Sequence, residues 1–310
     1  MCWTATWRND RPPLRPKEKI IETIHTVEWM KQAAREARAR ERPIGFVPTM
    51  GALHEGHFSL VRAARRDCSP VVASIFVNPK QFGPSEDFQK YPRPMEADST
   101  ALEALGVDYL FAPSPKEMYP EGYSTSVAVE GLGDRLEGRS RPGHFRGVST
   151  VVLKLFEIVQ PSFAYFGRKD AQQVRVLRQM ATDLNLDTQV VVCPIVREAD
   201  GLALSSRNAY LKPDERRAAT ALYRALEAVR REIAAGERDA VRLSVVLRRA
   251  LENEPLVALD YAEIVDAETL EPVLRLRRSC LVLLAAFVGA TRLIDNALVE
   301  EEGDSFRVSL

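Results

Sequence analysis

Two of the chain's four histidines stand three residues apart in the stretch TMGALHEGH, which runs from Thr49 to His57. The stretch lies between a short apolar segment at 44–47 and the pattern FSLVRAARR, whose apolar residues recur at helical spacing. His54 and His57 are therefore predicted at the start of a helix, where backbone N–H groups and the positive end of the helix dipole attract anions. This arrangement suits phosphate. Two histidines that only cap the helix are the alternative reading.

Other uses of this segment fit its spacing less well. A metalloprotease helix needs histidines four apart with Glu beside the first, and His25 and His144 supply no matching spacing. The segment has the two glycines of a P-loop, but His57 and Phe58 stand where that loop needs Lys and Ser or Thr. The glycine fingerprint of dinucleotide-binding proteins is absent, and no Ser–His–Asp order is legible. These absences agree with a reaction in which a substrate carboxylate attacks a nucleotide phosphate.

Three further polar segments follow apolar runs of strand length. Asn78 and Gln81 follow the run at 71–77, GRKDAQQ (167–173) follows FAYF, and READGLALSSRN (197–208) follows TQVVVCPI. Ligands of an open parallel sheet bind beyond the carboxyl ends of its strands. We therefore expect all of these segments to meet the histidines in one crevice.

The side chains in these segments suit a nucleotide and a substrate with hydroxyl groups. Lys169 could give a point charge to a phosphate and Asp170 could accept from ribose hydroxyls, with a surface ion pair as the alternative. The segment Ser205–Arg207 offers hydroxyls and a guanidinium to phosphate oxygens, or forms a plain turn. The neutral amides of Gln81 and Gln173 suggest a polyol-like substrate.

Two features near these segments have less specific readings. Gln172 is expected on a solvated helix face. The loop RLEGRSRPGHFRG (135–147) is either a mobile basic lid or a solvated loop. Its arginines are Arg135, Arg139, Arg141 and Arg146.

Alternating strand and helix patterns predict the fold that must position these groups. The apolar runs are typical of parallel strands buried on both faces, and helical patterns lie between them. We therefore predict a Rossmann-like, doubly wound α/β domain over 18–196, preceded by a loose extension at 1–17. The strands are expected at 44–47, 71–77, 107–112, 163–167 and 188–195, and the helices at 20–40, 58–66, 96–105, 147–159 and 170–184.

The pattern changes after about Arg197. Two charged helices, near 214–235 and 239–252, precede apolar strand patterns near the chain's end. This order predicts a smaller α+β domain over 197–310. Its strands are expected near 259–265, 280–288 and 291–294.

The composition favours a soluble, cytoplasmic protein without a nucleic-acid or membrane partner. Lys and Arg together number 43, as do Asp and Glu, and the zero net charge argues against a polyanion as the main partner. The four scattered cysteines fit neither a disulfide framework nor a zinc site, so we expect reduced thiols. The start lacks the apolar core of a secretory signal, and the longest apolar run, at 280–290, is too short to span a bilayer.

The order of these motifs closely resembles the pantoate–β-alanine ligases (pantothenate synthetases), a family of the HIGH/KMSKS-type nucleotidyltransferase superfamily. HEGH is similar to the HIGH signature, LSSRN is similar to its KMSKS counterpart, and the likeness runs from about Ile20 to Val299. The segments that carry it are PTMGALHEGH, SIFVNPKQF, YPR, RPGHFRGVSTVV, FGRKDAQQ, VREADGLALSSRNAYL and RLIDN.

The resemblance implies a ligase that forms a C–N bond. Such an enzyme makes pantoyl adenylate and pyrophosphate from ATP and (R)-pantoate, and β-alanine then displaces AMP to give pantothenate. The resemblance also implies Mg²⁺ with the ATP, a homodimer, and a C-terminal domain that lies over the site. In this chemistry we expect His54, His57, Lys169, Arg207 and the helix N-terminus to offset the repulsion between carboxylate and triphosphate.

The resemblance assigns residues as well. His57, as a proton donor, with His54 and Lys169 form the implied catalytic group. Gln81 and Gln173 match pantoate-binding glutamines, Asn78 lies where β-alanine is held, and Asp98 is a candidate outer ligand of Mg²⁺. The implied ATP-binding positions are Met50, Gly51, Ala52, Leu53, His54, Glu55, Gly56, His57, Gly167, Arg168, Lys169, Asp170, Val196, Leu204, Ser205, Ser206 and Arg207.

Two departures and two rival functions stay open at this point. Arg168 stands where the family usually has Glu, which reverses a charge beside the ATP site, and residues 1–17 lie outside the family pattern. One rival is another nucleotidyltransferase, such as a cytidylyltransferase-like enzyme or a fragment of a class I aminoacyl-tRNA synthetase. The other is a non-catalytic nucleotide- or metal-binding module that uses His54 and His57.

Overall fold

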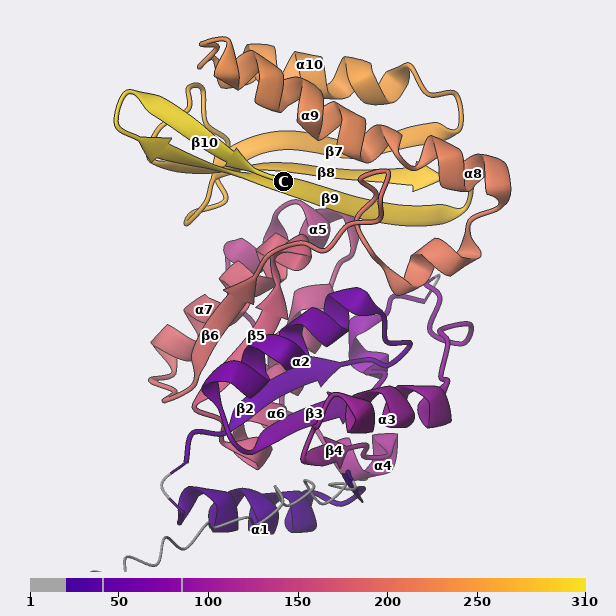
Figure 1. Ribbon diagram of the computed structural model, residues 1–310, viewed down its shortest axis with the longest axis vertical. Helices are drawn as coiled ribbons and strands as arrows, with labels where there is room; N and C mark the ends of the chain where they lie inside the picture. The colour runs from indigo at the N-terminus through magenta and orange to yellow at the C-terminus, as the bar shows by residue number, and fades with distance from the viewer. Residues whose placement is uncertain (1–20, 41, 85) are drawn as a thin grey trace, which may run out of the picture.

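The computed structural model describes residues 21–310 apart from 41 and 85, and it contains two sheets with their helices (Figure 1). The extension predicted at 1–17 lies outside the described residues. The first sheet has six parallel strands in the order β1-β4-β3-β2-β5-β6, and the second has four antiparallel strands in the order β10-β9-β8-β7. The predicted fold class, a doubly wound α/β sheet with a smaller α+β part, is confirmed.

The first sheet is built from residues before 194. Its strands are β1 (Glu22–Ile24), β2 (Gly45–Thr49), β3 (Val71–Ile75), β4 (Tyr109–Phe111), β5 (Phe163–Gly167) and β6 (Gln189–Cys193). The accompanying α-helices are α1 (Val27–Arg38), α2 (Glu55–Asp67), α3 (Met95–Ala104), α4 (Pro115–Met118), α5 (Glu137–Ser140), α6 (His144–Val159) and α7 (Ala171–Asp183). Three 3-10 helices are η1 (Pro79–Gln81), η2 (Leu132–Asp134) and η3 (Arg168–Asp170).

The second sheet follows the segment that carries the Ser–Ser–Arg motif. That segment ends in a further 3-10 helix, η4 (Ser206–Tyr210). The helices are α8 (Pro213–Ala218), α9 (Ala221–Ala234) and α10 (Ala240–Glu252), and the strands are β7 (Val257–Asp266), β8 (Ser279–Val288), β9 (Thr291–Glu302) and β10 (Ser305–Ser309). In the part of the chain that the structure describes, no helix is both long and apolar enough to cross a membrane.

Two predicted helices differ from the observed ones. The helix predicted from residue 20 begins only at Val27, because the Thr26 hydroxyl caps it by accepting from the Trp29 N–H at 3.3 Å, and the residues before it pair with β4 as an edge strand. The helix predicted over 214–235 is interrupted between α8 and α9. There the Thr220 hydroxyl donates to the Arg217 carbonyl at 2.7 Å, a local bond that competes with regular helix.

The last two strands were the hardest to predict from sequence. β9 is three times the expected length because its central residues, Asp295 and Asn296, are polar and interrupt the apolar pattern, although both are buried. β10 was not predicted at all, since its residues are exposed or half-buried and it lies at the sheet's edge.

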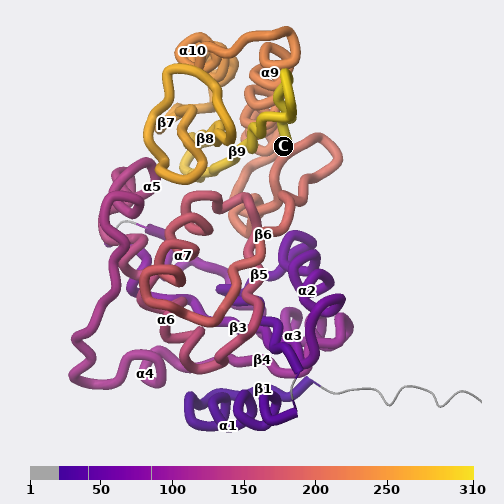
Figure 2. The backbone as a smooth tube through the Cα atoms, turned by 90° about the vertical axis from the view of Figure 1, so that its left-hand side faces the viewer, coloured from indigo at the N-terminus to yellow at the C-terminus, as the bar shows by residue number. Residues whose placement is uncertain are grey.

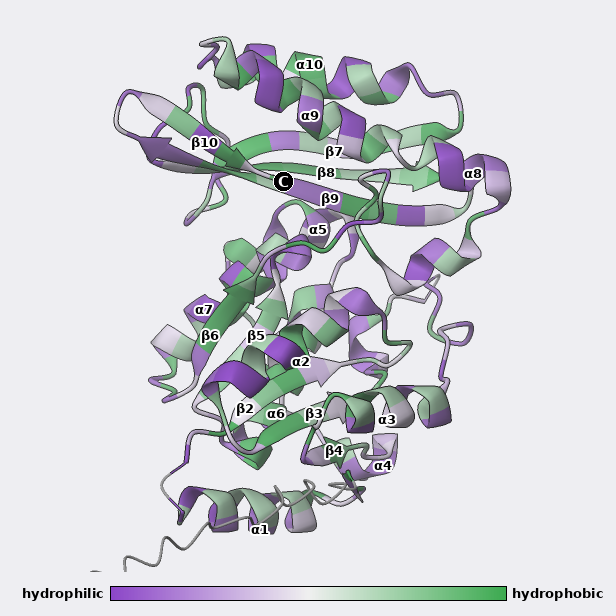
Figure 3. Cartoon of the chain, in the orientation of Figure 1, coloured by the Kyte–Doolittle hydropathy of each residue, from purple (hydrophilic) through white to green (hydrophobic). Residues whose placement is uncertain are grey.

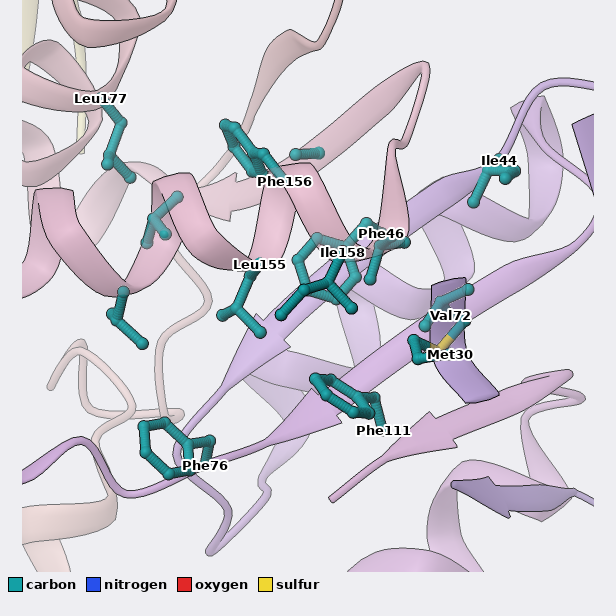
Figure 4. Packing of buried hydrophobic residues seen from close by; sticks show 14 of the residues in the cluster. Met30, Ile44, Phe46, Val72, Phe76, Phe111, Leu155, Phe156, Ile158 and Leu177 are labelled. Carbon is teal, nitrogen blue, oxygen red and sulfur yellow. The ribbon is translucent and has the colours of Figure 1, made fainter. Parts of the chain in front are cut away.

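Both faces of the first sheet are covered by helices. Phe46 of β2 packs with residues of α1, α6 and α7, while the next residue, Val47, packs with α2 and α3 on the opposite face. Figure 4 shows Phe46 beside Ile158 of α6, with Val72 and Phe111 from the neighbouring strands. Burial on both faces explains why these strands read as continuous apolar runs rather than alternating ones.

The second sheet is also covered twice, although it is antiparallel. Alternate residues of β8, such as Val282 and Leu284, pack against α9 and α10. Those between them, such as Leu283, face the first sheet with Leu136 and Ala171. Figure 2 shows α9 and α10 on one side of this sheet and the first sheet on the other, and Figure 3 colours β8 as largely hydrophobic. The run at 280–290 is therefore a buried strand, as predicted.

The first sheet opens between β2 and β5. From β2 the chain adds β3 and β4 on one side, and it later adds β5 and β6 on the other. The ladder between β2 and β5 ends at the pair Phe46 and Ala164, two residues before Pro48, which has no N–H to donate. Ligands of open α/β sheets bind at such a switch point, beyond the carboxyl ends of the strands.

Helix α6 supports one wall of this opening by touching η1 backbone to backbone. A Cβ added at Gly147 would overlap the carbonyl group of Lys80 and lie 2.7 Å from Gln81 Cα. Only glycine allows this approach, so Gly147 fixes the place of Gln81 relative to α6.

We expect Gly147→Ala to destabilise the protein by about 1–3 kcal/mol, because the added methyl group must push η1 and α6 apart. Urea denaturation measures this change. Gly83→Ala is the matched control, since its Cβ would meet only the flexible Glu86 side chain, at 3.5 Å or more. Equal stability of the two variants would contradict the close packing of α6 on η1.

Candidate active site

Three adjacent cavities form one crevice at the carboxyl ends of β2 and β5. The first has a volume of about 200 Å³ and the second about 180 Å³, and both have Met50, His57 and Arg207 in their walls. The third, of about 40 Å³, lies beside Lys169 and is also lined by Tyr261 and other residues of the second sheet. The crevice therefore extends from the switch point of the first sheet to the face of the second.

The first cavity combines two amides with an apolar wall. Gln81, from η1, and Gln173, from α7, provide the amides that the sequence singled out. The apolar wall consists of Phe76, Val148, Val151, Val152, Leu155 and Phe166. A small molecule with both hydroxyl and methyl groups fits this lining.

The second cavity holds most of the predicted phosphate-binding groups. It brings three of the four expected segments to one place: the histidine segment, the Lys169 segment and the Ser–Ser–Arg segment. The fourth reaches only the first cavity, through Gln81. The Ser206 hydroxyl donates to the Ala52 carbonyl at 3.0 Å, which joins two of these segments directly. The predicted residues in its wall are Met50, His54, Gly56, His57, Gly167, Lys169, Asp170, Val196, Leu204, Ser205, Ser206 and Arg207.

The two histidines cap α2, as the alternative reading had it, and they also line the crevice, where the phosphate-binding reading placed them. His54 Nδ1 accepts from the Gly56 N–H at 3.1 Å, and His57 Nδ1 accepts from the His54 N–H at 3.3 Å. Because each Nδ1 accepts, each neutral ring must carry its proton on Nε2. A Cβ at Gly56 would lie 2.8 Å from the His54 ring, so glycine is required beneath this cap.

Burial keeps both rings neutral at pH 7. Burial, with Lys169 nearby, lowers the pKa of His54 to about 4. Burial, with His54 and Lys169 nearby, lowers the pKa of His57 to about 3. We expected both imidazoles to offset the repulsion between the anions, but as neutral rings they bring no positive charge. They offer N–H donors, while full positive charge comes from Lys169 and Arg207.

Two neighbouring acidic residues pair with arginines at the crevice. Asp87 accepts from Arg207 at 2.9 and 3.0 Å, and Glu86 accepts from Arg141 at 2.6 and 3.0 Å. Burial alone would raise the pKa of Asp87, but the hydrogen bonds and charge of Arg207 outweigh it and hold that pKa below its usual value. The cations of the crevice are thus partly neutralised by the chain itself.

Arg141 and His144 line the crevice but were not predicted as site residues. His144 Nδ1 donates to the Gln81 carbonyl at 2.9 Å, so its Nε2 is left to accept from Arg141 at 3.1 Å. Burial, and then the charge of Arg141, lower the pKa of His144 to about 4. The sequence signal that could have identified them is RPGH, which lies in the loop read as a mobile basic lid or a solvated loop.

The arginine-rich loop is partly solvated and partly buried: Arg139 and Arg146 are exposed, whereas Glu137 and His144 are buried. The Gln172 side chain is buried, accepts from the Glu137 N–H at 3.0 Å and donates to the carbonyls of Leu132 and Arg135 at 2.8 Å, so the solvated face expected for it is wrong. Glu137 in turn accepts two bonds of 2.7 Å from Arg292 of β9. The loop therefore joins α7 to the second sheet.

Asp98 and Asn78 support the crevice from behind. The two carboxylate oxygens of Asp98 accept from the N–H groups of Ala52 and Leu53 at 2.8 and 2.9 Å, and so fix the turn before His54. Asn78 donates to Gln81 Oε1 at 3.0 Å and is itself buried. Within the described part of the chain, neither side chain lines the three cavities.

Arg168, which stands where the family usually has Glu, turns away from the crevice. Its guanidinium donates to the carbonyl of Ser309 at 3.1 Å, next to β10's end. Five of the predicted ATP-binding positions lie outside the walls of the described cavities: Gly51, Ala52, Leu53, Glu55 and Arg168. Glu55 pairs with Arg62 instead. The reversed charge therefore does not face the second cavity.

Comparisons with known proteins agree in one family. The family model described as pantoate-beta-alanine ligase matches residues 22–298. A pantothenate synthetase of Acidobacterium capsulatum is 57% identical over 93% of this chain and 100% of its own length. Another, of Heliobacterium modesticaldum, is 56% identical over 91% of this chain and 99% of its own length.

Solved structures give the same answer. The pantothenate synthetase from Thermus thermophilus has a TM-score of 0.84 and 48% identity, covering 89% of this chain and 98% of its own. The pantoate-beta-alanine ligase from Francisella tularensis, complexed with beta-gamma ATP and beta-alanine, has a TM-score of 0.73 and 36% identity. The match covers 92% of this chain and 100% of its own.

The buried imidazoles predict a loss of stability in mild acid. Between pH 7 and 5 an unfolded chain protonates its histidines, whose ordinary pKa is 6.5, whereas His54, His57 and His144 stay neutral in the native state. The unfolded state then binds more protons, so the free energy of unfolding falls as the pH falls. Urea denaturation at pH 7 and 5 measures this, and His57→Asn should reduce the difference. An equal or larger difference in that variant would contradict the low pKa of His57 in the native state.

Proposed function

The chain belongs to the pantoate–β-alanine ligase family and joins pantoate to β-alanine with ATP, and from this premise we propose that the crevice between β2 and β5 is its active site. The observation that carries the proposal is the meeting of His54, Lys169 and Arg207 in one cavity. We assign the second cavity to ATP and the first to pantoate.

The first reaction step joins two anions. An oxygen of the pantoate carboxylate attacks the α-phosphorus of ATP, the bond to the β-phosphate breaks, and pyrophosphate leaves with the electron pair. Negative charge grows on the departing group, so donors that face it bind the transition state better than the ground state. Lys169, Arg207 and the N-terminus of α2 are the groups that suit this role.

The neutral histidines contribute hydrogen bonds rather than charge at the start of this step. The Nε2–H groups of His54 and His57 are suited to phosphate oxygens, because each Nδ1 already holds the helix cap. The neutral ring of His57 has no acidic proton to transfer, so it can stabilise the leaving group by a hydrogen bond from its Nε2–H. The proton-donor role implied for this position would first require the phosphates to raise the pKa of His57. For Arg207 to bind the phosphates of ATP, the phosphates must displace the Asp87 carboxylate from its guanidinium group.

Pantoate fits the first cavity by its chemistry. It carries two hydroxyl groups and two methyl groups on a short chain. Gln81 and Gln173 can hydrogen-bond the hydroxyls, and the wall that includes Val148 and Phe166 can pack on the methyls. Asn78 fixes the orientation of Gln81, since it holds Oε1 and leaves Nε2 toward Met50.

Mg²⁺ is proposed to arrive with ATP. Among the described residues no group of three or more His, Cys, Asp or Glu side chains could hold a metal ion, and Mg²⁺ commonly uses phosphates with only one or two carboxylates. Asp170 borders all three cavities and is the carboxylate best suited to assist it, whereas both oxygens of Asp98 already accept from the backbone. The ion would neutralise charge on the departing pyrophosphate.

The second step depends on positioning. The neutral amine of β-alanine attacks the acyl carbon of pantoyl adenylate, the C–O bond to AMP breaks, and the amine loses a proton. Asn78 makes four hydrogen bonds of its own, with Gln81, Gly147, Lys80 and Tyr119, so we propose that it serves this step through Gln81. Holding amine and acyl carbon in contact supplies most of the acceleration.

The proposals for oligomeric state, compartment and domain boundary rest on the family resemblance and on a few local features. We propose a homodimer that works in the cytoplasm, and the buried free thiols of Cys68, Cys193 and Cys280 suit a reducing compartment. We also propose that the two domains divide between Val196 and Arg197, with the second over the crevice. The end of β6 at Cys193 supports this division.

Lys169→Ala and His57→Ala should each lower adenylation by roughly 10²–10³-fold, because each removes a preorganised donor. Exchange of labelled pyrophosphate into ATP measures this step. Lys116→Ala, an exposed lysine of α4, is the matched control and should leave exchange unchanged. Near-native exchange in either variant would remove that residue from the mechanism.

The same exchange assay separates the rival functions. Pantoate should be required for exchange if the ligase activity resides in this crevice. Exchange that depends on another acid would favour a related nucleotidyltransferase. Bound nucleotide without any exchange would favour a non-catalytic module.

A pantoate analogue without hydroxyl groups should react roughly 10²–10⁴-fold more slowly in kcat/KM, because it leaves the amides of Gln81 and Gln173 unpaired. Gln173→Leu should reduce the ratio of kcat/KM for pantoate to kcat/KM for the analogue. Gln179→Leu, on the same helix but outside the crevice walls, is the control and should preserve it. A ratio near one in the unaltered enzyme would disprove the role of the amides.

A further inference from the structure

Two adjacent residues at the centre of β9 are buried and polar, and neither has a role in the proposed reaction steps. Asp295 is 2% exposed and Asn296 is 1% exposed, and they belong to the RLIDN motif. Asn296 Nδ2 donates to the carbonyl oxygens of Arg168 and Lys169, both at 2.9 Å. A side chain of the second sheet thus holds two consecutive peptide groups of η3.

The amide orientation follows from its neighbours. Two carbonyl oxygens can only accept, so the group that faces them must be the NH₂ of Asn296. With both of its hydrogens used, this NH₂ group fixes the two carbonyls relative to each other as well as to β9.

These peptide groups lie where the first sheet no longer supports the chain. The ladder between β5 and β6 ends at Gly167 and Cys193, and α7 begins only at Ala171. Arg168 and Lys169 lie between these ends, in a 3-10 turn of three residues. The Asn296 amide reaches the backbone of this turn from the opposite sheet, and so it restrains the segment that carries the Lys169 ammonium group.

Asn296 is itself held firmly. Its N–H donates to Asp295 Oδ1 at 2.8 Å, and Asp295 accepts from both Nη groups of Arg197 at 2.7 and 3.0 Å. Arg197 also donates to the Gly201 carbonyl at 3.0 Å, within the segment that continues to Ser205–Arg207. Adjacent residues of β9 thus hold both of the segments that bring cations to the second cavity.

We propose that Asn296 is a positioning residue for Lys169: by clamping the carbonyls of Arg168 and Lys169, it aims the Lys169 ammonium group at the triphosphate. This inference rests on the proposed role of Lys169 in adenylation. Without the clamp two half-buried carbonyls lose their donor and η3 relaxes. A displacement of about 1 Å at a reacting group is enough to cost on the order of 10²-fold in rate.

The test is a double-mutant cycle in the full-length enzyme, read by pantoate-dependent pyrophosphate exchange. Asn296→Ala should lower kcat roughly 10- to 100-fold while leaving KM for pantoate nearly unchanged, since the groups assigned to pantoate, Gln81, Gln173 and the apolar wall, lie outside η3. In a Lys169→Ala background the same substitution should change kcat by less than about twofold, because the group that it positions is already gone.

A stability control separates positioning from a general loosening of β9. Val299→Ala removes packing from the same strand on its helix-covered face, so it should lower the melting temperature without lowering exchange at 25 °C. A loss of exchange in Val299→Ala as large as that in Asn296→Ala would overturn the proposal.

The remaining outcomes distinguish the two proposals. Full exchange in Asn296→Ala, or an equal loss in the presence and absence of Lys169, would overturn the role of Asn296 alone. Full exchange in the single Lys169→Ala variant would overturn the proposed role of Lys169, and the role of Asn296 with it.

Discussion

The divergence of β2 and β5 is the constraint on which the site depends. Their ladder stops at Phe46 and Ala164, and Pro48 cannot extend it because it lacks an N–H group. Beyond this point the two strand ends lead to the histidine cap of α2 and to the turn that carries Lys169. β2 continues into the turn before His54, and β5 continues into the turn that carries Lys169. The opening between strands thus sets the distance between the helix cap and the lysine.

The polar groups around this opening are held by neighbours rather than left to solvent. Asp98 fastens the turn before His54, Asn78 and His144 fasten Gln81 and its segment, and Asn296 fastens the Lys169 turn. Each support is buried, and a buried polar group must be hydrogen-bonded to be tolerated. The supports are therefore hydrogen-bonded to the segments that they hold, and they come from the helices around the first sheet and from a strand of the second.

The sequence predicted the sheet, most helices and the residues that meet in the crevice, because these features leave local patterns. Continuous apolar runs marked the strands, and the order of HEGH, GRKD and SSRN marked the strand ends. What could not be predicted depends on distant partners. The burial of Gln172 depends on a loop some 35 residues away, and the neutral state of His57 depends on burial that no local pattern encodes. The same holds for β9, whose buried polar pair reads as a break in the strand.

The pairing of Arg207 with Asp87 and of Arg141 with Glu86 has a consequence for ligand choice. Both carboxylates belong to the chain, so they compete with any incoming anion at a high effective concentration. A solute with a single charge gains little by displacing a tethered competitor that already makes two good bonds. A polyphosphate, which engages several cations and backbone donors together, gains enough to do so. At Arg207 and Arg141 the chain's own carboxylates thereby favour a polyphosphate over an anion that binds by one charge alone.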